Sequence, residues 1–495
     1  MSKEYLRPGV FVEEVPPGEQ PIQAVGTSTG AFIGIAEKGA LNKPKLVTNW
    51  SQFVKDFGAH RRDSFLAHAV QGFFLNGGSR CFVVRVASSS AAIAQAMLQD
   101  RAGTPEDTLR VQALNEGEWG NRLSLDVADG TKAPATEFML VVKLDSEVVE
   151  TWDDLSLDPE AENYVAAVIN DSSTYIQVTD LESVTASPEN RPVVQSDVPL
   201  AGGADGASDI TDSDYVGSSA DRTGLYAFDT VDEINNLCVP GVSTQTVVQA
   251  ALDYCDGRGD CGFIVDSPEG GDPISTKTFR ELFDSSRGYY YFPRIKALDP
   301  LTKRVKVVPP SGHIAGVFAR SDGGRGVHKA PSNEVVRGAV GLEYEVTDGE
   351  QEILNPAGVN CIRAFRGRGI RIWGARTMSS DPSLTHIHKR RFLMFVEESI
   401  AESTQWIVHE PSDERLWGKI VRSVSAFLRR QWLEGALFGA SEAEGYYVKC
   451  DAETNPPEVR AAFQVITEIG VNIVETAEFV IFRIAQWSGG GRISE

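Results

Sequence analysis

The sequence has no hydrophobic run long enough to cross a membrane and no leader of the secretory kind. A spanning helix needs about 18 uncharged apolar residues, and no stretch of this 495-residue chain approaches that length. The N-terminus also lacks the basic and then apolar pattern of a signal peptide. We therefore expect no membrane insertion and no export by a general secretion route, which places the chain in the cytoplasm of the producing cell.

Cysteine is scarce, and the usual ligand-binding motifs are missing. The six cysteines are scattered without a CxxC pair, a pattern that favours reduced, buried thiols over a zinc site or a disulfide framework. Cys255 and Cys261 bracket Asp-Gly-Arg-Gly-Asp, and the sequence leaves open whether they form a small disulfide. No G-K-[ST] phosphate loop occurs either. We therefore expect no cofactor and no metal.

Positive charge is in short supply. Lys and Arg number 47 against 69 Asp and Glu, so the net charge is −22, which argues against nucleic acid or anionic lipid as the main partner. Residues 91–205 hold 22 acidic and 6 basic residues, a net of −16. Residues 361–437 hold 13 basic and 8 acidic residues, a net of +5. This asymmetry predicts an acidic, solvent-facing region and a basic face turned toward a partner.

The chain does contain alternating strand and helix signals. Residues 22–25 and 31–36 suggest two strands about a glycine turn, and Ser51–Phe57 suggests a short helix. A helical repeat of apolar residues over Ser64–Asn76 ends at two glycines before the strand-like run 81–86. A similar alternation returns from about residue 206, after an acidic block of short alternating strands. The pattern indicates an α/β body interrupted by a β-rich insertion.

At this length two or three domains are expected, and the predicted fold class is a multidomain α/β (mixed α+β) protein. Its predicted parts are an N-terminal arm (1–20), a central α/β domain (21–90 and 206–345), an inserted acidic β-rich domain (91–205), a C-terminal domain of α+β type (346–476) and a C-terminal arm (477–495). In the C-terminal part, Asp381-Pro-Ser383 is predicted to open one long helix, and Ser412 to cap a second.

Both ends of the chain look like strands that lack a sheet. The run Glu478–Trp487 is apolar on both faces and is followed by three glycines, while Tyr5–Val15 is cut off from the rest by Pro16-Pro17-Gly18. Such a strand either closes its own sheet or completes the sheet of another chain. The residues predicted to make the inter-subunit contact are Val10, Phe11, Val12, Phe479, Ile481, Phe482 and Ile484.

Several longer motifs resemble one family. They are Pro8–Val15, Gly26-Thr-Ser-Thr with Phe32-Ile-Gly34, Phe73–Gly78 before a Val-Val-Arg strand, Val308–Val317 with Arg325–Pro331, Leu354–Asn360, Gly369–Thr377, Tyr446–Asp451 and Ala477–Ile484. In this order they resemble the tail sheath proteins of contractile phage tails and related contractile injection systems. The acidic insertion has no part in the resemblance.

The resemblance implies a structural protein with no cofactor, which is not an enzyme. It implies stacked hexameric rings that form a helical sleeve around an inner tube protein, with baseplate and terminator or cap proteins at the ends. The sleeve would contract and drive the tube through a target envelope, while the two arms add strands to sheets of neighbouring C-terminal domains. The chain would then leave the cytoplasm as part of an assembled tail-like particle.

A stripe of cations is the candidate tube-facing surface. Arg415, Lys419, Arg422 and Arg429 lie on one side of the second helix, opposite an apolar stripe of Trp417, Ile420, Val421, Val424 and Leu428. Lys389, Arg390 and Arg391 lie nearby in sequence and are included. A solvated helix face is the alternative.

Four short motifs suggest chemistry but lack its context. Ser28 lies in G-x-S-x-G, yet a strand and not a helix is predicted to follow it. Arg258-Gly-Asp260 is predicted to be a glycine-rich turn, His386 and His388 are spaced so that a helix would separate them, and Asp212-Ser-Asp214 lacks the later ligands of a calcium loop. Two alternatives remain: a baseplate or receptor-binding component that uses the insertion, and an α/β hydrolase.

Overall fold

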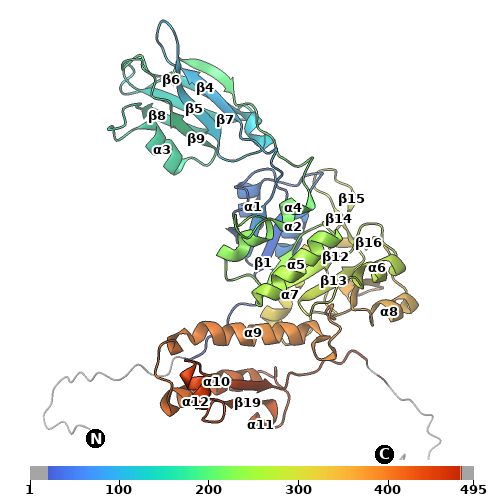
Figure 1. Cartoon of the computed structure of the whole chain (residues 1–495). Helices are drawn as coiled ribbons and strands as arrows, with labels where there is room; N and C mark the ends of the chain where they lie inside the picture. The colour runs from blue at the N-terminus through green and yellow to red at the C-terminus, as the bar shows by residue number, and fades with distance from the viewer. Residues whose placement is uncertain (1–20, 480, 482–495) are drawn as a thin grey trace, which may run out of the picture. The chain divides into compact units, whose positions relative to one another are not determined.

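The computed structural model of this chain describes residues 21–479 and 481, which fall into two compact units (Figure 1). The large unit holds residues 26–324 and 331–394. The C-terminal unit holds, among the described residues, 21–25, 325–330 and those from 395 onward. Both units mix helices and strands, which confirms the predicted fold class. No helix in the described ranges is long and apolar enough to cross a membrane.

An eight-stranded sheet forms the centre of the large unit. Six neighbouring strands run parallel, and an antiparallel strand closes each edge, as in a doubly wound α/β sheet. Across the sheet the order is β18 (Gly369–Ile372), β17 (Val359–Phe365), β13 (Gly288–Phe292), β12 (Gly262–Asp266), β11 (Asn236–Cys238), β1 (Gly30–Gly34), β3 (Cys81–Arg85) and β2 (Lys45–Val47).

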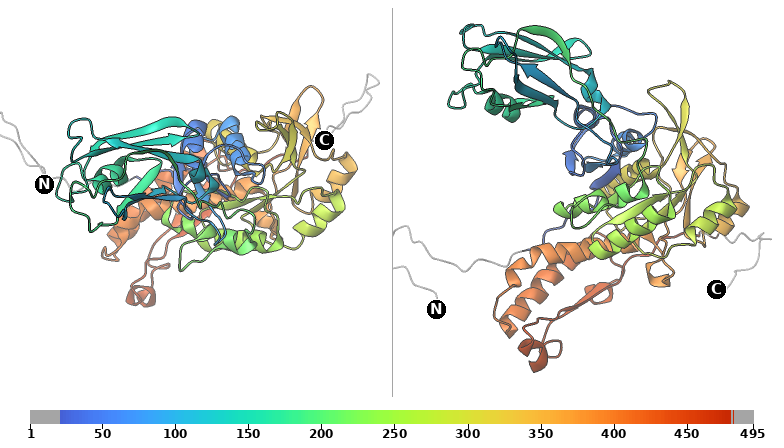
Figure 2. Two further views of the ribbon diagram at one scale, coloured as in Figure 1. Left: turned by 90° about the horizontal axis from the view of Figure 1, so that it is seen from above. Right: turned by 45° about the horizontal axis from the view of Figure 1, so that its top comes forward.

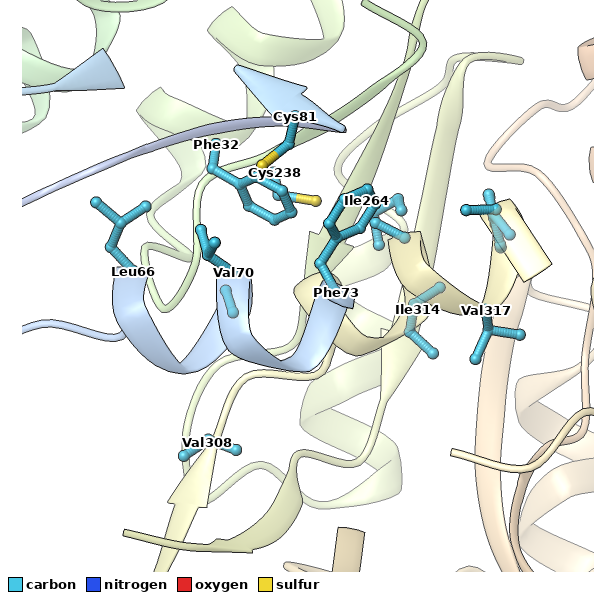
Figure 3. Packing of buried hydrophobic residues seen from close by; sticks show 14 of the residues in the cluster. Phe32, Leu66, Val70, Phe73, Cys81, Cys238, Ile264, Val308, Ile314 and Val317 are labelled. Atoms are coloured by element: carbon cyan, nitrogen blue, oxygen red, sulfur yellow. The ribbon is translucent and has the colours of Figure 1, made fainter. Parts of the chain in front are cut away.

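Helices cover both faces of this sheet because its strands are apolar on both sides. On β1, Phe32 belongs to one buried cluster, whereas Ala31 and Ile33 belong to the other. The first cluster is completed by α1 (Trp50–Phe57), α2 (Leu66–Asn76) and α7 (Ser311–Arg325), and the second by α4 (Asp212–Val216), the 3₁₀ helix η2 (Gly224–Thr230) and α5 (Gln245–Arg258). Figure 3 shows Leu66, Val70 and Phe73 of α2 gathered about Phe32 in the first cluster.

Smaller elements complete the body of the large unit. A three-stranded antiparallel sheet has the order β15 (Val305–Val308), β14 (Ile295–Leu298) and β16 (Ala339–Leu342). The remaining helices are α6 (Pro273–Arg280), α8 (Asp348–Leu354) and η3 (Pro382–Leu384). Cys255 and Cys261 are free, buried thiols whose Sγ atoms lie 3.4 Å apart.

The acidic insertion has a hydrophobic cluster of its own, drawn only from residues between Ala94 and Leu200. Figure 1 shows its strands and α3 gathered in one lobe. One of its two antiparallel sheets has the order β10 (Gln195–Pro199), β6 (Leu123–Asp129), β7 (Phe138–Leu144) and β8 (Glu147–Leu155). The other has the order β4 (Gln95–Gln99), β5 (Asp107–Ala113) and β9 (Ile176–Asp180). The helices η1 (Glu118–Arg122) and α3 (Val165–Ser172) pack with them.

Two long helices and a small sheet make up the C-terminal unit. The boundary between the units lies within α9 (Ile387–Ser403), and the later part of α9 lies beside α10 (Glu414–Leu433), where the Phe395 and Phe427 ring centroids are 5.8 Å apart (Figure 2). The other elements are η4 (Gln405–Ile407), α11 (Glu442–Gly445), β19 (Tyr446–Lys449), α12 (Pro457–Ala461) and β20 (Glu468–Val471).

Three predictions differ from this fold. Residues 22–25 form no strand. The long helix predicted from Asp381 begins at Ile387, after the separate short helix η3. The predicted boundary at residue 346 also differs from the structure, because β17 pairs in parallel with β13 and β18 extends the same sheet.

Candidate assembly surfaces

Helix α10 is amphipathic and begins at a strong cap. The Asp413 carboxylate accepts hydrogen bonds from the backbone N–H groups of Arg415 and Leu416. The predicted apolar stripe faces the interior: Trp417, Ile420, Val424 and Leu428 are buried and Val421 is half-buried. This periodicity fixes which side of α10 remains in solvent.

The four predicted cations of α10, Arg415, Lys419, Arg422 and Arg429, are all exposed. The Arg429 Nε lies 2.7 Å from the Glu442 carboxylate, and this guanidinium lowers the pKa of Glu442. Both side chains of that pair are well exposed, so the pair contributes little to stability. The exposed side of α10 therefore carries four cations, one of which is paired with Glu442.

The predicted surface does not extend to Arg390 and Arg391, which are both buried. The Arg391 guanidinium lies over the Phe318 ring, 4.6 Å from its centroid, and its Nη1 donates to Asp322 Oδ1 at 2.9 Å. Burial lowers the pKa of Arg391, but the Asp322 carboxylate outweighs it, so the pKa is raised overall. This arginine anchors the interior of the large unit, and including it in an exposed surface was wrong. Lys389 is half-buried.

The described N-terminal segment, residues 21–25, is tied to the helices of the C-terminal unit. The Gln23 and Val25 backbone N–H groups donate to the hydroxyls of Ser403 and Ser399, at 3.0 and 3.2 Å. Arg430 Nη2 donates to the Ile22 carbonyl at 2.6 Å, and the Ile22 side chain is buried. These side-chain partners replace a strand ladder, which explains why residues 22–25 form no strand.

The C-terminal unit holds a sheet of only two strands, β19 and β20, paired antiparallel with Tyr446 opposite Val471. Among the described residues no third named strand joins it. Of the predicted arm residues, Phe479 and Ile481 are described, and they are 73% and 79% exposed. Val10, Phe11, Val12, Phe482 and Ile484 lie outside the described residues.

Sequence reasoning missed a second group of exposed apolar side chains in this unit. Phe463 is 98% exposed just after α12, and its φ of 60° lies in the left-handed region. Leu433 at the end of α10 and Phe438 after it are 62% and 65% exposed. Single exposed apolar side chains are common, so this ring is a candidate partner contact only because it belongs to the unit that holds the two-stranded sheet. It belongs to no periodic run, so the sequence gave no signal for it.

The candidate chemical motifs have structural roles. Ser28 lies two residues before strand β1, and a strand follows it where the nucleophile elbow requires a helix, so that elbow is absent there. Arg258 forms an ion pair with Asp260 at 2.7 Å and donates to the carbonyls of Phe228 and Val231. Asp212–Val216 is a helix with a capping box, not a calcium loop. The described residues contain no group of three or more side chains suited to a metal ion.

Two family models match adjoining parts of the chain. The phage tail sheath protein central domain matches residues 206–378, and the phage tail sheath C-terminal domain matches residues 379–486. The chain is 24% identical over 492 residues to the tail sheath protein of Burkholderia phage BcepMu, covering 93% of this chain and 92% of that protein. It is 28% identical over 286 residues to a putative prophage major tail sheath protein of Pseudomonas aeruginosa, covering 55% of this chain and 72% of that protein.

Solved structures show the same fold. One is the sheath complex of an extracellular contractile injection system in its contracted state, with a TM-score of 0.62, 19% identity and coverage of 98% of this chain and 99% of the other. Another is the contracted helical sheath of the anti-feeding prophage, with a TM-score of 0.59, 21% identity and coverage of 97% and 99%. The chain belongs to the contractile tail sheath family and is a structural sheath subunit of a phage tail or a contractile injection system.

Proposed function

We propose that this subunit polymerises as stacked hexameric rings around an inner tube, and that contraction of the sleeve drives the tube through a target envelope. One observation carries the proposal. Both described ends of the chain, residues 21–25 and those up to 481, belong to the C-terminal unit, which also holds the small two-stranded sheet. Arms that leave from this unit are suited to link it with the same unit of neighbouring copies.

Strand donation is the proposed link. The strands β19 and β20 offer backbone donors and acceptors at their outer edges, and an added strand from another copy would satisfy them. The arm 477–495 supplies the alternating apolar residues that fix the register of such a strand. The arm 1–20 would do the same from the other end of the chain, which links each copy to more than one neighbour.

The energy of this joint suits a sleeve that changes length. Moving Phe479 and Ile481 from water into a neighbour's sheet contributes about 1.5–3 kcal/mol for each side chain, before ordering costs. The backbone hydrogen bonds add to that and hold the joint while the bodies rotate. Contraction would then release the difference in packing energy between two arrangements of the large units, without nucleotide hydrolysis.

The exposed cations of α10 are the proposed tube-facing surface. Ion pairs in solvent are individually weak, so such contacts can position the sleeve and still release during contraction. The proposal keeps Arg415, Lys419, Arg422 and Arg429, with the half-buried Lys389 at its margin. Baseplate and terminator proteins are the proposed partners at the two ends of the sleeve.

The arm contact is tested by a double substitution in the full chain. Phe479→Ser with Ile481→Ser should abolish tubes in negative-stain microscopy and leave a folded monomer. The matched control is Ile274→Ser with Ile353→Ser, two isoleucines of the large unit that are 79% and 58% exposed. Tubes of normal length from the arm variant would overturn strand donation. Hundreds of copies in each purified particle would separate a sheath from a baseplate component.

The tube contact is tested by charge reversal. Lys419→Glu with Arg422→Glu should leave monomer folding and tube-free polymerisation intact but prevent assembly around the inner tube. Lys132→Glu with Lys303→Glu makes the same change in net charge on the large unit and should assemble normally. If the α10 variant co-assembles with the tube as the control does, the tube-facing role of α10 is wrong.

A further inference from the structure

A cavity of about 560 Å³ lies within the large unit, where the insertion meets the central body. The central body supplies one wall from residues 38–45 and 55–57, and the insertion supplies the other from Leu114, Asn115, Trp119 and 173–175. Its size is typical of sites that bind small molecules. Neither family model covers these residues.

Four lysines line this cavity: Lys38, Lys43, Lys45 and Lys55. Asp56 is the one carboxylate among the lining residues, so the formal charge of the lining is +3 (four minus one). None of the four forms an ion pair with another described residue. Some other lysines of this acidic chain do form ion pairs, as Lys143 does with Asp126 at 2.6 Å and with Asp197 at 2.9 Å.

Lys38 is the one of the four lysines that contacts aromatic rings of the insertion. Its Nζ lies 5.8 Å from the ring centroids of both Trp119 and Tyr175, so two rings of the insertion hold a cation of the central body. Burial lowers the pKa of Lys38, which means that its ammonium group is only partly compensated for the loss of water. The Trp119 Nε1–H is buried and has no hydrogen-bond partner. An anion in the cavity would stabilise the charged form of Lys38.

We propose that this cavity binds a compact, multivalent anion of the phosphate or polycarboxylate class, and that the bound anion ties the insertion to the central body. The four lysines that line the cavity provide mobile point charges, which suit phosphate and carboxylate oxygens of varied geometry. Charge-assisted hydrogen bonds from several ammonium groups to one ligand are stronger than the same contacts made singly in solvent. The proposal goes beyond sheath assembly, because a single chain provides both walls.

The test uses the full chain with pyrophosphate and citrate as separate probes, by calorimetry at low ionic strength. Lys43→Gln with Lys45→Gln should weaken binding roughly tenfold or more, because two of the four charges are removed. The matched control is Lys132→Gln with Lys303→Gln, which has the same net charge but leaves the cavity intact. Tighter binding of one probe would assign the ligand to the phosphate or to the polycarboxylate class.

Hydrogen exchange locates the bound anion. Saturating probe should slow exchange both in residues 38–45 and in residues 173–175, which belong to the two walls. Denaturant unfolding without ligand checks that the Lys43 and Lys45 variant remains folded. No binding of either probe at millimolar concentration, equal weakening in both lysine pairs, or protection on one wall alone would overturn the proposal.

Discussion

The large unit and the C-terminal unit both bury aromatic residues, but the C-terminal unit also leaves some phenylalanines in water. In the large unit three consecutive tyrosines, Tyr289, Tyr290 and Tyr291, are completely buried in the middle of the eight-stranded sheet. In the C-terminal unit Phe463 and Phe479 lie largely in water, and the sheet has two strands. A two-stranded sheet is marginally stable by itself. The large unit thus completes its central sheet within one chain, whereas the proposed strand donation would enlarge the small sheet of the C-terminal unit.

Acidification should have the largest effect on the stability of the large unit, because it acts on buried histidines there. His68 and His313 are each 4% exposed, and burial lowers the pKa of each to about 4. The groups that face His68 are His60, Asp299 and Lys306. The folded state therefore binds fewer protons than the unfolded state between pH 6.5 and about 4. The stability that these two neutral histidines contribute is fully present above pH 6.5 and is lost on acidification.

The full shift corresponds to an upper bound of about 3 kcal/mol for each histidine. Denaturant unfolding of the large unit, measured from neutral pH to pH 4.5, should show this loss. His68→Gln with His313→Gln should flatten the profile over that window, whereas His409→Gln, at an exposed site of the C-terminal unit, should not. An identical pH dependence in the double variant and the wild type would show that the buried histidines are not responsible.

Removing one partner of the buried ion pair should have the next largest effect. The Asp322 and Arg391 side chains are 5% and 3% exposed, and Asp322→Ala would leave the guanidinium without its counter-charge. We expect a loss of about 3–5 kcal/mol in the free energy of unfolding, measured by denaturant titration. Asp322→Leu with Arg391→Met should recover most of it, since no buried charge remains. A double variant as unstable as the single one would contradict this explanation.

Such a pair shows where sequence reasoning reaches its limit. Arg391 lies in a Lys-Arg-Arg run that is typical of a solvated surface, and its partner is 69 residues away in the sequence. The run 22–25 has the composition of a strand, but its N–H groups are taken by Ser399 and Ser403, far along the chain. Helix 64–76 and the stripe of α10 were predicted well because their signal is a local period. Contacts between distant segments leave no such signal.

Helix packing in the large unit supplies a third test with a control in the same helix. On α7, a Cβ at position 312 would lie 2.2 Å from the Ala69 carbonyl oxygen of α2, whereas a Cβ at position 323 meets nothing within 4 Å. Gly312→Ala should cost about 1–3 kcal/mol, because the backbone of α2 cannot move aside easily. Gly323→Ala should stabilise by about 0.5–1 kcal/mol through helix propensity. Thermal unfolding compares the two, and equal effects would show that the helices can separate freely.

The assembly surfaces, like the fold, could be predicted where the signal is a local period and not where it depends on contacts between distant segments. The exposed cations of α10 could be read from spacing, because the opposite stripe is apolar and must face inward. The cavity lysines could not, since Lys38 meets Trp119 and Tyr175 only when the insertion folds back on the central body. Phe463 was missed for a third reason: a single exposed ring in a loop has no neighbours that form a pattern with it.

The smallest expected effect on the isolated chain is also the sharpest test of the comparison. Phe463→Ser removes a ring that is 98% exposed, so the free energy of unfolding of the monomer should change by less than about 0.5 kcal/mol. If the C-terminal unit is completed by other copies, the same variant should raise the protein concentration needed for tubes to form, as measured by sedimentation. Phe73→Ala, in the buried core of the large unit, should instead act on the monomer and lower its free energy of unfolding by about 3–5 kcal/mol. A Phe463 variant that assembles like the wild type would mean that an exposed ring in this unit is no sign of an interface.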